Sequence, residues 1–141
     1  MKKILILALG ALAMISCAKQ PCDARHTCWA YDATIYELNT RQATPEGTFA
    51  AAEALLPELK ESGVDIIWIM PIQKIGVLER KGTLGSYYAI TDYCEFNPEF
   101  GTRADFEHFL AKAHELGMKV ILDWVANHAA PDSEWTKNEG W

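Results

Sequence analysis

The sequence has few positive charges and no cluster of them. Its 141 residues contain 13 Lys and Arg against 19 Asp and Glu, which gives a formal net charge of −6. Nucleic-acid binding needs grouped Lys and Arg side chains that neutralise phosphates. The sequence therefore predicts that nucleic acid is not a partner.

Two common site signatures are also missing. The spacing of the four cysteines matches no zinc motif. No glycine-rich phosphate-binding turn follows the first predicted strand, which disfavours a dinucleotide-binding sheet. Half of the residues are apolar, as expected of a globular chain rather than a disordered one.

The N-terminus has the pattern of a secretory signal peptide. Lys2 and Lys3 precede an apolar run over residues 4–15, which is too short to span a membrane stably. Residues 14–17 (MISC) resemble a bacterial lipoprotein box, although Met is less usual than Leu at its first position. The alternative is an ordinary signal peptide that happens to contain Cys17.

We therefore expect three segments along the chain. Residues 1–16 form the signal peptide, residues 17–27 hold the lipidated Cys17 and a polar linker, and residues 28–141 form the domain. The protein is then exported and membrane-anchored, in the outer membrane or facing the periplasm. In that oxidising compartment Cys22 and Cys28 can pair, which leaves Cys94 free.

The remaining sequence alternates strand and helix patterns. Strands are predicted at residues 33–38, 64–69 and 118–123, and helices at residues 48–62 and 103–116. Pro57 interrupts the first helix. The nearly continuous apolar run of the second strand suits a parallel strand covered on both faces. Residues 73–101 are predicted to form a long loop of the kind that is usually functional. Both a doubly wound sheet and a closed (β/α)8 barrel fit this order.

Residues 120–128 (VILDWVANH) hold the most informative pattern. Asp123 stands at the carboxyl end of a buried strand, and Asn127 and His128 follow on the loop that leaves it. In a parallel barrel, that edge is where ligands bind. Taken alone, the pattern fits equally well a structural aspartate followed by turn residues, because short patterns recur by chance.

Four other segments accompany this pattern in a fixed order: residues 35–42 (IYELNTRQ), 63–72 (GVDIIWIMPI), 85–93 (GSYYAITDY) and 97–102 (NPEFGT). Together they resemble glycoside hydrolase family 13, the α-amylase family, over roughly residues 30–128. The resemblance implies an α/β fold, namely the N-terminal three β/α units of a (β/α)8 TIM barrel. Such a barrel needs about 250 residues, so the chain is expected to be truncated.

The resemblance also implies roles for individual residues. Tyr88 is similar to the aromatic residue that stacks on the sugar at the cleavage site, whereas its neighbour Tyr87 is the better candidate for loop packing. His128 is similar to a histidine that hydrogen-bonds the same sugar. Asn127 resembles a calcium ligand, so calcium is an expected cofactor. Asp123 resembles an aspartate that supports the catalytic centre without being its nucleophile.

The resemblance places the catalytic pair outside this chain. Retaining glycosidases use two carboxyl groups about 5–5.5 Å apart, and in this family they follow the fourth and fifth strands. We therefore expect an enzyme on α-linked glucans for the full-length parent, and no activity or stable fold for the 141-residue chain alone. The alternative is a non-catalytic carbohydrate-binding or scaffold fragment.

Overall fold

A computed structural model of the protein describes residues 27–137 of the chain. The chain divides after Asp32 into two units. The described part of the first unit holds one turn of 3-10 helix, η1 (Cys28–Ala30). No helix among residues 27–137 has the length and hydrophobicity that crossing a membrane requires.

Two cysteines can be assigned within the described residues. Cys28 is disulfide-bonded, and Cys94 is an exposed, free thiol. This is consistent with a disulfide in the segment that precedes the domain. The predicted signal peptide, the lipidated Cys17 and the expected partner Cys22 lie outside the described residues.

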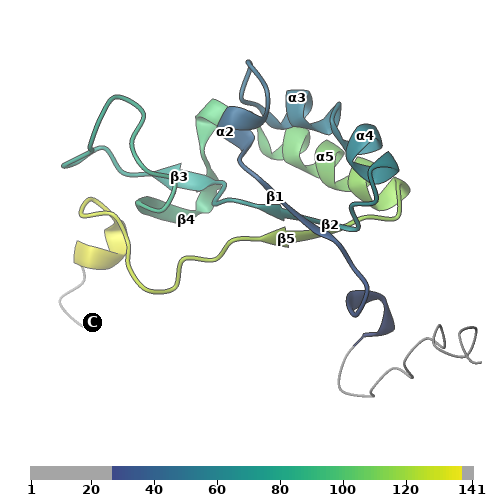
Figure 1. Cartoon of the computed structure of the whole chain (residues 1–141). Coiled ribbons are helices and arrows are strands. Elements are labelled where there is room, and N and C mark those ends of the chain that lie inside the picture. The colour runs from purple at the N-terminus through teal and green to yellow at the C-terminus, as the bar shows by residue number, and fades with distance from the viewer. Residues whose placement is uncertain (1–26, 138–141) are drawn as a thin grey trace, which may run out of the picture. The chain divides into compact units, whose positions relative to one another are not determined.

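The second unit is built on a parallel sheet with the strand order β1-β2-β5. Its strands are β1 (Ile35–Leu38), β2 (Ile66–Ile69) and β5 (Lys119–Leu122). Helices occupy both connections between them (Figure 1). The predicted β–α–β–α–β order is therefore confirmed, although each strand begins one or two residues later than the pattern indicates.

One face of this sheet is covered more completely than the other within the described residues. Side chains of paired residues project from the same face of a sheet. Leu38, paired with Ile69, is buried in the core together with Ile67, on the side where α3, α4 and α5 lie (Figure 1). The opposite face carries Trp68 and Ile121, which are 37% and 43% exposed. Ile66, which projects from the same face as Trp68, is 4% exposed, so the prediction that the second strand is covered on both faces holds except at Trp68.

The predicted helix over residues 48–62 is two short helices, because Pro57 cannot donate an intrahelical hydrogen bond. Pro57 lies instead in the first turn of the second helix, where that donor is not needed. Thr48 caps the first helix by accepting a hydrogen bond from the backbone of Ala51. The elements between β1 and β2 are α2 (Thr40–Ala43), α3 (Phe49–Glu53) and α4 (Leu56–Glu61). The short helix α2 was not predicted.

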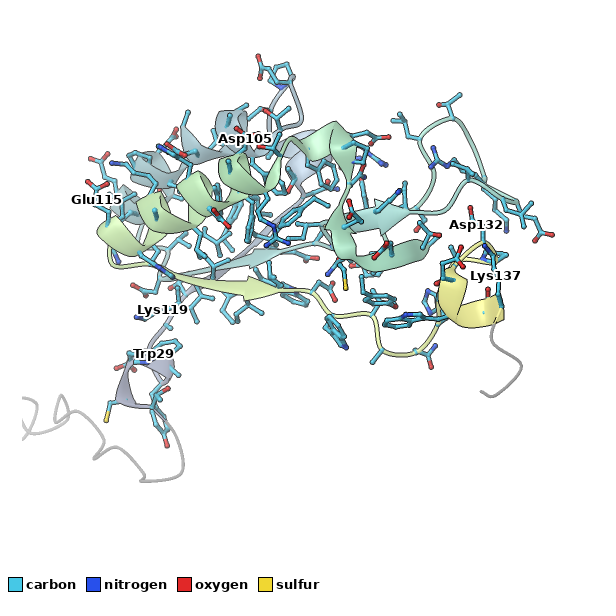
Figure 2. All side chains as sticks on the ribbon, turned by 180° about the vertical axis from the view of Figure 1, so that it is seen from behind. Trp29, Asp105, Glu115, Lys119, Asp132 and Lys137 are labelled. Carbon is cyan, nitrogen blue, oxygen red and sulfur yellow. The ribbon has the colours of Figure 1, made fainter. Side chains whose placement is uncertain are left out.

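Helix α5 (Arg103–Glu115) follows its prediction closely (Figure 2). Its N-terminus is a capping box. The Thr102 hydroxyl accepts from the Asp105 amide at 3.3 Å, and the Asp105 carboxylate accepts from the Thr102 amide at 2.7 Å. The buried face of the helix consists of Phe106, Phe109 and Ala113.

Phe49 is the centre of the core in this unit. Its ring meets those of Phe96, Phe100 and Phe106 at centroid distances of 6.1, 5.9 and 5.3 Å, each with the edge of one ring toward the face of the other. Such contacts add to the free energy gained from burial alone. They join α3 and α5 to the segment between β2 and α5.

The prediction of one long loop over residues 73–101 is wrong. This segment contains an antiparallel pair, β3 (Gln73–Ile75) and β4 (Ile90–Phe96), and a turn of 3-10 helix, η2 (Pro98–Phe100). β3 has only three residues and its register is irregular, so it leaves little alternation to detect. The Gly76 amide donates to the Ala89 carbonyl at 2.9 Å, which closes the base of a shorter loop over residues 76–89. The pair lies beside the end of the sheet at which β1 leads into α2 (Figure 1).

Replacement of the capping residue Thr102 tests the assigned N-cap of α5. We expect Thr102→Ala to lower the free energy of unfolding by about 1 kcal/mol, because one helix N–H loses its acceptor. Thr102→Ser keeps the hydroxyl and is expected to stay close to the wild type. Urea unfolding of the full-length gene product measures both variants. Equal unfolding midpoints for the wild type and the alanine variant would contradict the assigned cap.

Candidate functional site

The three parallel strands end at the same edge of the sheet. One residue past β2, the Met70 amide donates to Leu38 of β1 at 3.0 Å, and one residue past β5, the Asp123 amide donates to Ile69 of β2 at 2.9 Å. These bonds fix the backbone of Asp123 against the sheet. Because side chains alternate along a strand, Asp123 shares the face of Ile121, away from the helices.

The loop over residues 76–89 brings Tyr88 to this edge. The Tyr88 hydroxyl donates to the Asp123 carboxylate at 2.9 Å. Burial raises the pKa of Tyr88 above its ordinary value of 10.0, and the hydrogen bond and negative charge of Asp123 raise it further, with a smaller contribution from Glu37. The two residues, predicted separately, therefore form one unit, and no pattern in the sequence indicated the bond between them.

His128 contacts the backbone of the same tyrosine. Its Nε2 lies 3.0 Å from the Tyr88 carbonyl oxygen. Since a carbonyl only accepts, Nε2 must carry the proton in this arrangement. Nδ1, 3.5 Å from the side-chain nitrogen of Asn127, is then the acceptor. Two of the predicted sugar-binding residues and the supporting aspartate thus lie in one hydrogen-bonded cluster.

Asn127 is exposed, and its side-chain nitrogen lies 3.5 Å from Nδ1 of its neighbour His128. Calcium is bound by 6–8 oxygen ligands. Residues 27–137 contain no group of three or more His, Cys, Asp or Glu side chains that could hold a metal ion. His, Cys, Asp and Glu side chains among residues 27–137 therefore do not by themselves supply a calcium donor set.

Tyr87 and Tyr88 contact different parts of the structure. The Tyr87 ring packs against the core cluster, and its hydroxyl accepts a hydrogen bond from the Asn39 side chain at 3.1 Å. Tyr88 turns toward Asp123. The assignment of Tyr87 to loop packing is confirmed.

A second contact that sequence reasoning missed ties this loop to the segment after β5. One carboxylate oxygen of Asp132 accepts from the backbone amides of Val77 and Leu78 at 2.8 and 3.2 Å. These bonds hold the pKa of Asp132 below its ordinary value of 3.8. A Cβ on Gly76 would lie 2.2 Å from the other oxygen of Asp132, so only glycine fits there. Figure 2 labels Asp132 in this segment.

An aromatic group beside His128 also escaped prediction. The Tyr93 ring stacks on Trp135 of η3 (Glu134–Lys137) at 4.5 Å and tilts against Trp124 at 5.2 Å. The Tyr93 hydroxyl lies 2.9 Å from the His128 carbonyl oxygen. These three rings, Asn127 and His128 line an open hollow of about 490 Å³. In the sequence only Trp124 and Trp135 lie within or close to the motif over residues 120–128, whereas Tyr93 belongs to the separate segment over residues 85–93.

Comparison with known proteins agrees with this geometry. The family model "Alpha amylase, catalytic domain" matches residues 32–140, which include Tyr88, Asp123 and His128. The chain belongs to the α-amylase family.

The related proteins are much longer than this chain. Alpha-amylase MalA of Haloarcula japonica is 38% identical over 116 residues, which cover 80% of this chain and 16% of that protein. Oligo-1,6-glucosidase of Parageobacillus thermoglucosidasius is 31% identical over 76% of this chain and 19% of its own length. The crystal structure of an α-amylase from Lactobacillus plantarum is 50% identical with a TM-score of 0.73, and the match covers 74% of this chain and 25% of that one. The chain therefore spans about a sixth to a quarter of these relatives.

Titration of Tyr88 tests the cluster. The pKa of Tyr88 is raised, so its bond to Asp123 stabilises the fold fully below pH 10.0 and is lost as the pH rises through the raised pKa. We expect Asp123→Asn to lower this pKa but to leave it above 10.0, because burial, the largest cause, remains. NMR of ¹³C-labelled tyrosine, assigned with Tyr88→Phe, measures the shift in the full-length gene product. An unchanged Tyr88 titration in Asp123→Asn would contradict the contact.

Proposed function

We propose that this chain forms the N-terminal three β/α units of a (β/α)8 barrel in a retaining glycoside hydrolase that acts on α-linked glucans. The observation that carries the proposal is the cluster of Tyr88, Asp123 and His128 at the carboxyl edge of a parallel sheet. Barrel enzymes place their active sites at that edge. The chain spans 16–25% of the length of the relatives described above, and a barrel of this type has about 250 residues, so we propose that the remaining strands belong to a longer protein.

Tyr88 would supply the aromatic face that packs on a glucose ring. Its hydroxyl is already bonded to Asp123, so the ring has a fixed orientation and loses little freedom when sugar binds. Asp123 accepts this bond with one oxygen, and its other oxygen can accept from a sugar hydroxyl. The family resemblance implies that Asp123 is a positioning and binding group and not the nucleophile, and the proposal keeps this role.

His128 would complete the sugar contacts. Its Nε2 proton is held by the Tyr88 carbonyl, and its ring is exposed beside the hollow that Tyr93, Trp124 and Trp135 line. A sugar hydroxyl that reaches Nε2 would share or replace this contact. The exposed aromatic faces of the hollow suit the apolar face of further glucose units.

We propose that Asn127 is one ligand of a bound calcium ion. The amide oxygen of Asn127 is a hard donor of the type that calcium takes. The remaining oxygens would come from residues outside those described. Because the described His, Cys, Asp and Glu side chains do not by themselves form the donor set, we assign no step of the reaction to the ion.

The DNA that follows the Trp141 codon provides the first test. We expect the frame to continue into strands that carry an Asp, a Glu and a second Asp at their carboxyl ends. We expect the full-length gene product to hydrolyse an α-linked glucose oligosaccharide with retention at the anomeric carbon, read by NMR. The 141-residue chain alone is expected to be inactive.

Two variants of the loop over residues 76–89, a test variant and a control, probe the role of Tyr88 in this assay. Tyr88→Ala is expected to lower kcat/KM at least tenfold, since loss of stacking of about 1.4 kcal/mol corresponds to that factor. Leu84→Ala removes an exposed apolar side chain from the same loop and should leave activity close to the wild type. A stop codon after Trp141, or later strands without the three carboxylates, would overturn the proposal that the protein is a glycoside hydrolase. Either result would favour a non-catalytic carbohydrate-binding fragment.

We also propose that the protein is an exported lipoprotein anchored through Cys17, on the strength of the lysines, the apolar run and the MISC segment at its N-terminus. Wild-type protein should incorporate labelled fatty acid and sediment with membranes. Cys17→Ser should lose the label, whereas Cys94→Ser, which alters an exposed free thiol, should keep it. Labelling of the Cys17→Ser protein would contradict the anchor.

A further inference from the structure

Arg41 joins the end of β1 to the loop that carries Tyr88. It lies in α2, immediately after the strand, and its side chain is only 14% exposed. Its Nη1 donates to the Gly85 carbonyl and its Nη2 to the Leu84 carbonyl, each at 3.2 Å. Its Nε and Nη2 also donate to one carboxylate oxygen of Glu99, at 3.2 and 2.7 Å. One guanidinium thus holds two successive carbonyls of the loop.

The same guanidinium also holds the side chain that precedes Tyr88. Its central carbon lies 4.3 Å from the centre of the Tyr87 ring, within the range of a cation–π contact. Asn39, two residues before Arg41, donates to the Tyr87 hydroxyl at 3.1 Å. The ring and the hydroxyl of Tyr87 are therefore both held by residues that follow β1.

These contacts fix the backbone from which Tyr88 projects. Gly85 and Tyr87 are held on the side of β1, while the carbonyl of Tyr88 is held by His128 on the side of β5. Tyr88 lies between these attachments and reaches Asp123 with its hydroxyl at 2.9 Å. A change at the β1 attachment would therefore move the tyrosine ring even though Arg41 does not touch it.

We propose that Arg41 is a positioning residue, which sets the orientation of the Tyr88 ring for sugar binding through Gly85 and Tyr87. The inference rests on the proposed function of Tyr88. Arginine is required because its planar group donates in several directions and stacks on a ring at the same time. Lysine keeps the positive charge beside Glu99. It has no planar group to stack on Tyr87, and it has only one nitrogen with which to reach the two carbonyls.

The test compares Arg41→Lys with Arg103→Lys in the full-length gene product. Arg103 is an exposed arginine in α5 that also lies over an aromatic ring, 5.0 Å from that of Phe96 in β4, which is outside the loop over residues 76–89. We expect Arg41→Lys to lower kcat/KM on an α-linked glucose oligosaccharide about tenfold, mainly through a higher KM. Arg103→Lys should stay within about twofold of the wild type.

Two readouts separate positioning from a merely structural role. The Tyr88 titration should move toward its ordinary range in Arg41→Lys, because a displaced ring loses its bond to Asp123. In a Tyr88→Ala background, Arg41→Lys should cost little further activity, since residues that act as a unit are not additive. An additive loss, or a lower unfolding temperature with an unchanged Tyr88 titration, would show a structural tether and overturn the inference.

The outcome also distinguishes this inference from the proposed function. If the wild-type protein lacks activity on glucans, the proposed function fails. The Tyr88 titration in Arg41→Lys and in Arg103→Lys still reports whether Arg41 orients the tyrosine. An unchanged titration in both variants would overturn the positioning role, whatever the activity.

Discussion

The hydrogen bond from the Tyr88 hydroxyl to Asp123 joins residues that are 35 positions apart in the sequence. It closes the loop over residues 76–89 onto the edge of the parallel sheet, and both partners owe their positions to other elements. Asp123 is fixed by the backbone bond to Ile69 of β2, and Tyr88 by contacts with His128 and with the segment after β1. The site therefore depends on all three parallel strands.

The sheet that carries this site is packed against the helices on one of its faces. Phe49 and the three phenylalanine rings around it hold the helices and the β3–β4 pair to the buried face. The other face presents Trp68 and Ile121 among the described residues. Exposed large apolar side chains on a sheet face need a covering layer, and in a closed barrel that face is the packed interior. The proposed closed barrel would account for this feature.

Local sequence signals predicted the regular elements well. The capping box at Thr102, the break at Pro57 and the apolar runs of β2 and β5 each depend on near neighbours, so they can be recognised in the sequence. The β3–β4 pair was missed because three residues with irregular pairing leave almost no alternation. The apolar run of β2 did not reveal that Trp68 is partly exposed, since exposure depends on what other segments cover.

The residues of the candidate site were predicted from the sequence, but the hydrogen bonds that join them were not. The order of motifs identified Tyr88, Asp123 and His128, yet the bonds among them, and those of Arg41 and Asp132 to the loop, link residues that are 35–55 positions apart. Such contacts depend on the folded chain and have no local signature. A crystal structure of the full-length protein with a bound α-linked glucose oligosaccharide tests the account most directly. We expect a glucose ring packed on Tyr88 within hydrogen-bond distance of Asp123 and His128, and a sugar bound away from this edge would contradict the proposed site.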